Sequence, residues 1–340
     1  MTERLSFIVN TDRVSGQRAV MKKISIISPC FNEEDNVETC YATVRRIFET
    51  ELSGYAREHI FCDNASADRT VEILRGIAAT DPDTKVIVNA RNFGLFRSTF
   101  NGLRYATGDA IVVMLPVDLQ DPPELIPEFV KHWEEGFPIV YGIRAVRNEN
   151  LPLRSARRAF YWIVNRISDF EIPENVGEFQ LIDRKVLNVV LQFEDKYPYI
   201  RGIIAACGFP KKAIPYTWRR RARGVTKYNL GTLIDNAFNG ILSFTHVPMR
   251  LCTYVGFLLA TLSILFSLGM VAAYFVNSDV VPRGITTLLV GLFFLSGVQL
   301  MFIGVLGEYV TSIHSQVRRG PMVIEQERIN VEAQGRDSIQ

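Results

Sequence analysis

The chain alternates short apolar runs with amphipathic stretches from residue 22 to about residue 142. Between the apolar runs, hydrophobic residues recur at helical spacing over about 36–52, after Ser66, over 95–106 and from Pro122 onward. Five runs have the length and the β-branched or aromatic content of strands: ISIIS (24–28), HIFC (59–62), VIV (86–88), IVVML (111–115) and IVYG (139–142). This alternation predicts an α/β domain with a mostly parallel sheet.

Two long segments near the C-terminus carry no Asp, Glu, Lys, Arg or His. They cover residues 251–276 and 284–307. At about 1.5 Å per residue, each is long enough to cross a hydrocarbon layer of about 30 Å. The residues between them, 277–283, allow only a tight turn. We therefore predict a transmembrane hairpin, and two buried core helices are the alternative.

Basic residues flank this predicted hairpin on both sides. The turn itself has only Arg283, which is opposed by Asp279. The flanking residues are Arg219, Arg220, Arg221, Arg223, Lys227 and Arg250 before the hairpin, and Arg318 and Arg319 after it. Because positive flanks stay on the cytoplasmic side, the pattern predicts an inner (plasma) membrane protein with a cytoplasmic N-terminal domain and two cytoplasmic termini.

These features divide the chain into six predicted parts. Residues 154–170 and 230–247 mix aromatic, aliphatic and polar positions at helical spacing, which fits either interfacial helices or ordinary core helices. The six parts are an N-terminal tail (1–21), a large cytoplasmic domain (22–215), a basic loop with an interfacial helix (216–250), two membrane spans (251–276 and 284–307) and a cytoplasmic C-terminal tail (308–340).

The composition excludes several classes of protein. A formal net charge of +2 over 340 residues gives no basis for nucleic-acid binding. The five cysteines are scattered without CxxC spacing, which argues against a disulfide framework or a zinc site. Neither the GxGxxG fingerprint nor the P-loop signature occurs, so dinucleotide-binding and P-loop proteins are excluded as well.

Polar residues follow the predicted strands, at the positions where α/β proteins bind ligands. The run 111–115 is followed by Pro116, Asp118, Gln120 and Asp121. On an extended chain Asp118 and Gln120 project to the same side, so their oxygens can share one site. The alternative is structural: Pro116 ends the strand, and Asp121 caps the helix that begins at the next two prolines.

Six motifs, followed by the two predicted spans, resemble one family. They are PCFNEEDN (29–36), CDNASADRT (62–70), ARNFG (90–94), VDLQDPPE (117–124), GEFQLIDRK (177–185) and RARGVTK (221–227). In this order they are similar to the polyisoprenyl-phosphate glycosyltransferases, relatives of dolichyl-phosphate mannose synthase and bactoprenol glucosyltransferases. The resemblance covers residues 22–320. It implies the inverting GT-A fold and a membrane enzyme of cell-envelope polysaccharide biosynthesis, which moves a sugar from a nucleotide-sugar to an undecaprenyl-type polyprenyl phosphate.

The resemblance also implies a nucleotide-binding site. Family members usually carry a second acid and a glycine after the position of Asp63, where this chain has Asn64 and Ala65. The resemblance therefore does not determine which nucleobase the donor carries. Asn64 and Ser66 also fit a structural role in capping the next helix. The residues matched to nucleotide binding are Pro29, Phe31, Asn32, Glu33, Asp63 and Asn92.

By the same resemblance, Asp118 and Gln120 are expected to hold Mg²⁺ or Mn²⁺ beside the donor diphosphate, and Asp118 is counted as catalytic. Pro116 replaces the family's first acid, which implies a weaker dependence on the metal. A juxtamembrane patch on anionic lipid is an alternative role for the arginines of the basic loop. The residues expected to bind phosphate are Arg144, Arg154, Arg221 and Lys227.

Glu178 stands where the family usually has an aspartate that is described as the catalytic base. The second pKa of a phosphate monoester is about 6, so the acceptor is largely ionised at neutral pH and needs little help from a base. We therefore expect Glu178 to be a catalytic residue that orients groups around the sugar. An ion pair with a neighbour such as Arg201 is the structural alternative.

Two other functions are compatible with parts of the sequence. A noncatalytic accessory subunit that binds nucleotide-sugar or lipid phosphate would explain Pro116, but it would not need Asp63, Asp118, Glu178 and Lys227 together. A lipid-sugar flippase would need more than two spans unless the chain forms a homo-oligomer, and similar proteins form tetramers.

Overall fold

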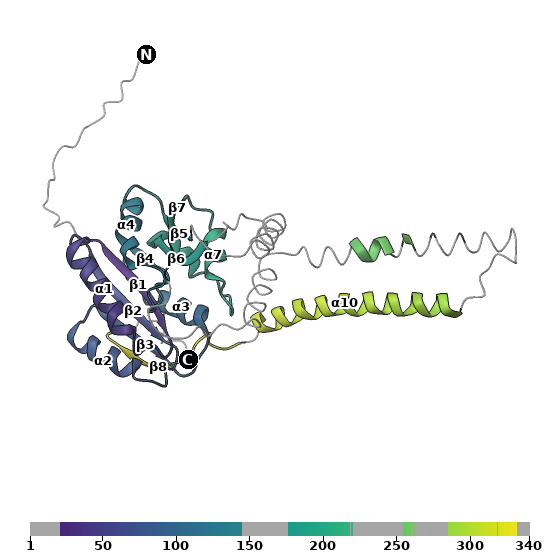
Figure 1. Ribbon diagram of the computed structural model, residues 1–340, viewed down its shortest axis with the longest axis horizontal. Helices are drawn as coiled ribbons and strands as arrows, with labels where there is room; N and C mark the ends of the chain where they lie inside the picture. Colours follow the sequence, from purple (N-terminus) through teal and green to yellow (C-terminus); the bar gives the residue numbers. More distant parts are fainter. Residues whose placement is uncertain are drawn as a thin grey trace, which may run out of the picture.

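The computed structural model describes residues 21–144, 176–217, 219, 254–259, 261–262, 265, 269, 285–317 and 319–331. Its centre is an eight-stranded sheet with the order β7-β5-β6-β4-β1-β2-β3-β8 (Figure 1). The strands are β1 (Lys23–Cys30), β2 (Ala56–Asp63), β3 (Thr84–Asn89), β4 (Ala110–Val112), β5 (Ile139–Arg144), β6 (Val176–Asp183), β7 (Lys211–Tyr216) and β8 (Glu325–Ile329).

Helices cover both faces of this sheet, which confirms the predicted α/β class. One apolar cluster joins the first face to α1 (Val37–Thr50), α2 (Thr70–Thr80) and α4 (Ile126–Glu134), which follows the short helix η1 (Pro123–Leu125). A second cluster joins the other face to α3 (Leu95–Leu103), α6 (Arg184–Val190) and α7 (Ile200–Ala206). The protein therefore has three layers, with the sheet in the middle.

Most neighbouring strands run parallel, as the sequence predicts. β1 pairs in parallel with β2 and β4, β2 with β3, and β5 with β7. The antiparallel strands are β6, between β4 and β5, and β8, beside β3. The carboxyl ends of the six other strands therefore lie at one edge of the sheet, together with the first residues of β6 and β8. We call this edge the carboxyl edge.

β4 is shorter than the predicted strand 111–115. It ends at Val112, but the next residues continue to pair, because Val113 N donates to Gln180 O (2.8 Å) and Leu115 N donates to Ile27 O (2.8 Å). Pro116 follows directly and accepts at its carbonyl oxygen from Leu119 N (3.2 Å), which closes a turn. The proline thus ends the extended segment, as its missing N–H requires.

The predicted C-terminal tail contains a strand of the main sheet. Residues 325–329 form β8 and pair with β3, and Ala90 N donates to Ile324 O (2.9 Å). Met322 and Val323 are buried in the second apolar cluster. The chain therefore returns to the domain after its last helix, so the segment 308–340 is not all tail.

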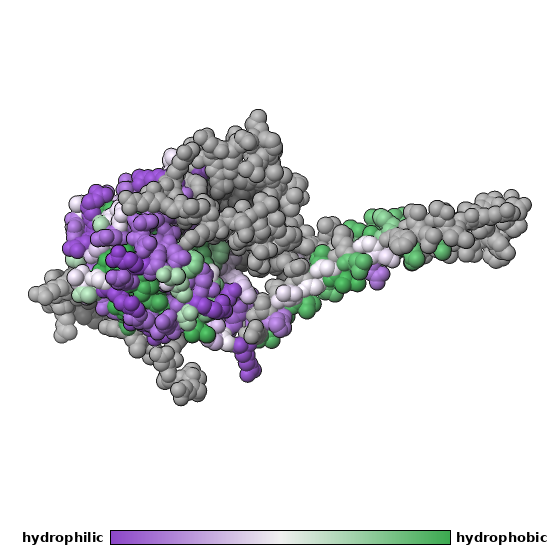
Figure 2. Space-filling model, turned by 60° about the horizontal axis from the view of Figure 1, so that its bottom comes forward, coloured by the Kyte–Doolittle hydropathy of each residue, from purple (hydrophilic) through white to green (hydrophobic). Residues whose placement is uncertain are grey.

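The last helix, α10 (Ile285–Val317), extends beyond the predicted span 284–307. Residues 294–311 within it are long and apolar enough to cross a membrane, and no side chain that the structure describes among them is buried. Figure 2 shows hydrophobic residues along this helix, away from the mostly hydrophilic domain surface. The other predicted span, 251–276, lies largely outside the described residues, although Tyr254, Phe257 and Leu258 within it are exposed and helical.

A buried ion pair joins the start of β2 to the end of α2. The Arg57 guanidinium donates to the Asp81 carboxylate, and both side chains are about nine-tenths buried. Burial alone would raise the pKa of Asp81, but hydrogen bonds from Arg57, Thr84 and Tyr41 lower it. Because this carboxylate depends on its partners, removing Arg57 would leave a buried negative charge poorly compensated.

We expect Arg57→Ala to lower the free energy of unfolding by about 3 kcal/mol, because breaking a buried pair from one side is strongly destabilising. Denaturant unfolding of the purified protein measures this change. The matched control is Arg45→Ala, whose partner Glu49 forms an exposed pair on α1 and whose loss should change little. Equal effects of the two substitutions would refute the role of the buried pair.

Candidate functional site

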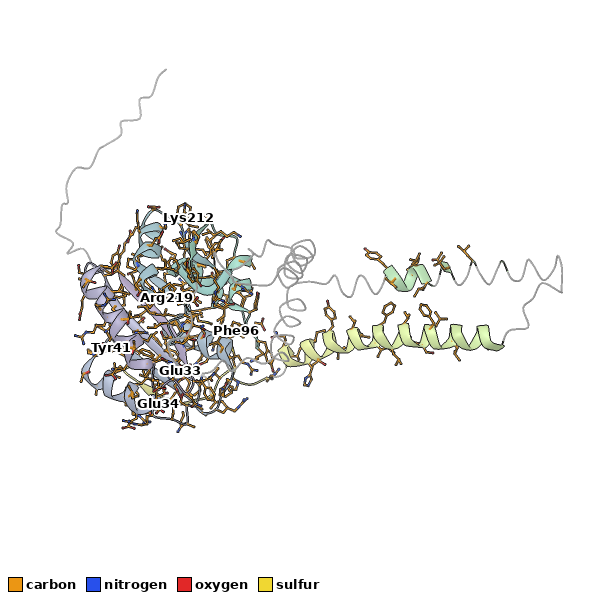
Figure 3. All side chains as sticks on the ribbon, in the orientation of Figure 1. Glu33, Glu34, Tyr41, Phe96, Lys212 and Arg219 are labelled. Carbon is orange, nitrogen blue, oxygen red and sulfur yellow. The ribbon has the colours of Figure 1, made fainter. Side chains whose placement is uncertain are left out.

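The carboxyl edge of the sheet collects most of the predicted site residues that the structure describes. Asp63 ends β2, Asn92 follows β3, and Asp118 and Gln120 follow β4. Two more strands bring predicted residues to this edge: Arg144 is the last residue of β5, and Glu178 is the third residue of β6. Figure 3 shows Glu33, from the loop after β1, and Arg219, from the segment after β7, both on this domain. Residues far apart in the sequence thus lie along one edge, as the fold requires.

The loops after β1 and β2 are tied together by polar side chains. Asn32 N donates to Ser66 Oγ (2.8 Å), and Asn32 Oδ1 accepts from Ala67 N (2.8 Å). Both Asn32 (φ +52°) and Ala65 (φ +62°) have left-handed backbones, which are uncommon for residues other than glycine and occur often at functional loops. These bonds hold a fixed pair of loops over the carboxyl ends of β1 and β2.

Asp63 is buried beneath these loops. Its carboxylate accepts from Ser66 N (2.9 Å) and from the Ser66 hydroxyl. Burial raises the pKa of Asp63, and the hydrogen bonds from Ser66 oppose that rise. Ser66 therefore bonds to Asp63 and Asn32, and it does not cap α2, whose N-cap is Arg69. The capping interpretation of Ser66 is wrong.

Asn64 holds the next loop of the edge and also has no capping role. Its Oδ1 accepts from Phe93 N (3.0 Å) and from Asn89 Nδ2 (3.1 Å). Asn92 Oδ1 accepts from Gly94 N (2.9 Å), which leaves the exposed Asn92 side chain at the outer surface of this loop. Gly94 has φ +89°, which glycine adopts without strain. Among the other matched residues, Pro29 is buried within β1, and Phe31 and Glu33 are half-buried.

The turn after β4 presents Asp118 at the same edge. Asp118 is buried, and its Oδ1 accepts from Gln120 N (3.2 Å). Leu119 between them has a left-handed backbone, with φ +52°. Gln120 O accepts from Arg219 N (3.0 Å), and Gln120 Nε2 lies 3.5 Å from Arg219 O. Gln120 therefore anchors the start of the basic loop through its backbone and its amide nitrogen.

The turn after β4 offers one buried carboxylate, that of Asp118, to the divalent ion expected from the sequence. No group of three or more His, Cys, Asp or Glu suited to hold a metal occurs among the described residues. Mg²⁺ usually keeps several waters and binds one or two carboxylates plus the substrate phosphates, so a complete protein cage is not required. In this turn Asp118 is the carboxylate that would bind such an ion.

Asp121 is buried in a polar cluster with Arg144 and Tyr216. Arg144 Nη2 lies 3.2 Å from Asp121 Oδ1, and Arg144 Nε donates to the Tyr216 hydroxyl (3.2 Å). The Tyr216 hydroxyl in turn donates to Asp121 Oδ1. The N-cap of η1 is Pro122, and no side chain caps it, so the interpretation of Asp121 as a helix cap is wrong.

Two glycines make room for the ring and the hydroxyl of Tyr216. A Cβ added to Gly142 on β5 would lie 2.6 Å from Tyr216 Cε1, and one added to Gly177 on β6 would lie 3.3 Å from the Tyr216 hydroxyl. Burial, followed by the negative charge of Asp121, raises the pKa of Tyr216, so the hydroxyl stays protonated and able to donate. Arg144, predicted to bind phosphate, is thus held in place from two sides.

We expect Tyr216→Phe to lower the free energy of unfolding by about 1–2 kcal/mol, because a buried hydrogen bond to a charged group is lost while the ring is kept. Thermal unfolding measures this change. We expect Tyr216→Phe to reduce the rate of sugar transfer less than Arg144→Gln, which removes the guanidinium itself. A larger loss of transfer in Tyr216→Phe than in Arg144→Gln would contradict this assignment.

Glu178 is close to this cluster and pairs with Arg201 at the start of α7. Arg201 Nε lies 3.7 Å from Glu178 Oε1, which confirms the predicted ion-pair alternative without excluding a site role. Glu178 Oε2 is buried and has no hydrogen-bond partner in the part of the chain that the structure describes. Burial raises the pKa of Glu178, and the positive charges of Arg201 and Arg144 only partly oppose the rise. The carboxyl group thus keeps one oxygen for a further partner.

Three predicted phosphate-binding residues, Arg154, Arg221 and Lys227, lie outside the described residues. Arg219, the last described residue of the predicted basic loop, lies at the carboxyl edge through its bonds to Gln120, and its guanidinium pairs with Glu124 (3.2 Å). Sequence reasoning missed Tyr216 and Tyr199, whose hydroxyl accepts from Arg201 Nε (2.8 Å). No motif pointed to either tyrosine: the partners of Tyr216, Asp121 and Arg144, are far from it in sequence, and Tyr199 bonds Arg201 locally, outside every matched motif.

The opposite edge of the sheet has a hollow of about 540 Å³, lined by residues of α1, the end of α2 and the segments that lead into β1, β2 and β3. Its lining includes Arg57 and Asp81, which already pair with each other. None of the residues matched to substrate binding lies there. Ligands of α/β sheets bind at the carboxyl ends of strands, so we do not assign this hollow to the substrates.

Comparison with known proteins identifies the family. The model of "Glycosyl transferase family 2" matches residues 25–191. An uncharacterized glycosyltransferase, YkcC, of Bacillus subtilis is 34% identical over 309 residues, which cover 91% of this chain and 94% of that protein. The SfII prophage-derived bactoprenol glucosyl transferase of Shigella flexneri is 37% identical over 303 residues, which cover 89% of this chain and 97% of the relative.

Solved structures resemble this one more distantly. The mannosyltransferase PcManGT of Pyrobaculum calidifontis, in complex with GDP-Man and Mn²⁺, has a TM-score of 0.44 and 16% identity, and the match covers 88% of this chain and 86% of that one. A TM-score this low supports no correspondence of individual residues. The sequence relatives, which match nearly end to end, are sufficient: this chain belongs to glycosyltransferase family 2.

Proposed function

We propose that this protein is an inverting glycosyltransferase that moves one sugar from a nucleotide-sugar to a polyprenyl phosphate at the cytoplasmic face of the inner membrane. The acceptor class is supported by relatives named bactoprenol glucosyl transferase, at 36–37% identity over nearly their full length. The observation that carries the proposal is the placement of Asp63, Asp118 and Glu178, from three separate elements, along one sheet edge.

The loops after β1 and β2 are the proposed seat of the nucleotide. The bonds between Asn32, Ser66 and Asp63 fix these loops before any ligand binds, so little ordering is needed on binding. Asp118 would hold Mg²⁺ or Mn²⁺ against the diphosphate, where the ion would stabilise the charge that develops on the leaving group. The side-chain oxygen of Gln120 is proposed as a second ligand of the ion. The amide nitrogen of Gln120 faces the carbonyl oxygen of Arg219.

The acceptor phosphate is proposed to approach from the side of Arg144 and Glu178. One of its oxygens forms a bond to the anomeric carbon while the bond from that carbon to the diphosphate breaks, and the electron pair leaves with the diphosphate. A single displacement of this kind inverts the anomeric configuration. Because the phosphate is already ionised, positioning accounts for most of the rate, and the free oxygen of Glu178 is suited to orient a sugar hydroxyl.

The C-terminal strand supports an even number of membrane crossings. β8 is hydrogen-bonded to β3, so the residues after α10 lie on the same side of the membrane as the domain. If α10 crosses the bilayer at residues 294–311, a second crossing must precede it. The segment 251–276 is the proposed second crossing, because it is long enough and carries no charge. A cytoplasmic C-terminus follows, and a homo-oligomer is compatible with this arrangement.

A screen of sugar nucleotides tests the proposed reaction. The purified full-length protein in lipid vesicles is incubated with polyprenyl phosphate, Mg²⁺ or Mn²⁺, and UDP- or GDP-sugars one at a time. We expect mass spectrometry to detect a polyprenyl phosphate that has gained one sugar, together with the free nucleoside diphosphate. Binding of a nucleotide-sugar without turnover of any donor would favour the noncatalytic accessory role. No other function is supported by a specific feature of the described residues.

A further inference from the structure

The loop between α6 and α7 exposes two aromatic side chains on the domain. We call residues 192–199 the aromatic loop. Within it, Phe193 is 39% exposed and Tyr197 is 48% exposed, whereas Pro198 is buried and the following residue Ile200 belongs to the core. Single exposed apolar residues are ordinary, but here two large aromatic side chains are exposed on one short loop, which suggests a surface that meets a partner.

The aromatic loop is fastened to the end of α10. Lys196 N donates to Gln316 Oε1 (2.9 Å), and Gln316 Nε2 donates to the Asp195 carboxylate. Lys196 Nζ donates to Gly320 O (2.6 Å), just beyond the helix. Backbone and side-chain bonds therefore hold the loop at a fixed height relative to the last turn of α10.

Exposed apolar side chains continue along α10 up to this junction. Val310, Ile313 and Val317 are more than half exposed, and so is Ile324 beyond the helix. Figure 2 shows the same helix as a largely hydrophobic surface leaving the domain. Exposed polar residues such as Thr311 and His314 lie between these apolar residues, so apolar positions, interleaved with polar ones, reach the level of the aromatic loop.

Basic and aromatic groups lie together at this junction. The Arg97 guanidinium lies over the Tyr197 ring, 4.1 Å from its centroid, and Phe96 contacts the Tyr199 ring edge-on. Figure 3 shows Phe96 at the side of the domain from which α10 extends. Aromatic and basic side chains at the end of an apolar helix are typical of the headgroup layer of a membrane. The carboxylate of Glu194 is also exposed there and offsets the positive charge of Arg97. We therefore expect the aromatic rings, rather than a net positive charge, to contact the lipid.

We infer that the aromatic loop lies in the headgroup layer of the bilayer, with the rings of Phe193 and Tyr197 inserted beside the end of α10. The inference rests on the proposed function, since it assumes that α10 spans a membrane. It also has a consequence for the site. Tyr199 and Arg201 follow the loop directly, and Arg201 pairs with Glu178, so contact with lipid would fix Glu178 relative to the membrane surface from which the acceptor arrives.

Fluorescence quenching by lipid tests this placement. Phe193→Trp and Tyr197→Trp are made one at a time in the full chain, which is then placed in bilayers of phosphatidylcholine with or without brominated acyl chains near the headgroup. We expect the added fluorescence, relative to the parent protein, to fall by about half or more in brominated lipid. The matched control is Glu49→Trp, an exposed position on α1, which lies on the side of the domain away from α10 (Figure 1) and should not be quenched. Equal quenching at all three positions, or none at 193 and 197, would overturn the inference.

A second variant separates this inference from the proposed function. We expect Phe193→Ser with Tyr197→Ser to reduce transfer to long-chain polyprenyl phosphate in bilayers about tenfold, and to leave transfer to a short-chain acceptor in detergent unchanged. A loss of the same size in both assays would count against lipid contact. If the parent protein forms no lipid-linked sugar at all, the proposed function fails, while the quenching result still decides the position of the loop.

Discussion

Replacing Asp118 by asparagine is expected to reduce sugar transfer by about 10²–10³-fold, the usual loss when one group that stabilises the developing charge is removed. Asparagine is the sharper substitution because its side-chain oxygen can still accept from Gln120 N, which holds the turn after β4. The change therefore removes the charge and keeps the local fold. Steady-state rates at saturating Mg²⁺ or Mn²⁺ measure the effect.

The matched control for Asp118→Asn is Glu124→Gln, an exposed carboxylate close in sequence that pairs with Arg219. It should transfer sugar at nearly the parent rate, because an exposed pair contributes little. Circular dichroism of both variants should match the parent protein. Near-normal transfer by Asp118→Asn would show that Asp118 does not bind the metal. Pro116 would then serve only to end the extended segment after β4.

Replacing Glu178 by glutamine is expected to lower the rate about tenfold and to change its dependence on pH. Burial raises the pKa of Glu178, so in the parent protein the carboxylate is lost as the pH falls through that raised value, and the rate should fall with it. Glutamine does not titrate, so the remaining acid limb should follow only the acceptor phosphate, with its second pKa near about 6. Above that pH the profile should be flat.

The size of the Glu178→Gln effect distinguishes an orienting group from a general base. General-base catalysis typically contributes about 10²–10⁴-fold, so a loss in that range would show that Glu178 takes a proton.

The pH dependence of stability provides a second test of the raised pKa of Glu178. A raised pKa means that the folded state favours the protonated carboxyl, so Glu178 contributes stability at low pH that is lost as the pH rises through the raised value. The free energy of unfolding of Glu178→Gln, relative to that of the parent protein, should therefore be highest at neutral pH and above.

The N-terminal half of the fold was predictable because its signal is local. Alternating strands and helices from β1 to β5 follow from β-branched runs and helical spacing, and the structure confirms them. β8 had no such signal, since its sequence EQERI is mostly charged and alternates half-buried with exposed residues at the sheet edge. It forms because of its partner β3, about 240 residues earlier in the chain. The antiparallel direction of β6 was not predictable either, because its partners β4 and β5 are separated from it in the chain and strand order is not encoded locally.

The candidate site was predictable where a residue follows a strand, and not where its partner is distant. Asp63 and Asp118 lie at the carboxyl edge because they end or follow β2 and β4. Asp121 fitted a helix cap from its neighbours in sequence, but Arg144 and Tyr216 reach it from two other strands. A side chain's partners across a sheet depend on strand order, which local spacing does not encode.

Photo-crosslinking of both substrates to the purified protein tests most directly whether they meet at one sheet edge. A photoreactive nucleotide-sugar is predicted to label peptides that contain Asp63 or Asp118, and a photoreactive polyprenyl phosphate is predicted to label peptides that contain Arg144 or Glu178. Unlabelled substrate should compete with each reaction. Labelling of the opposite edge, beside Arg57 and Asp81, or of two unconnected regions would contradict a shared site.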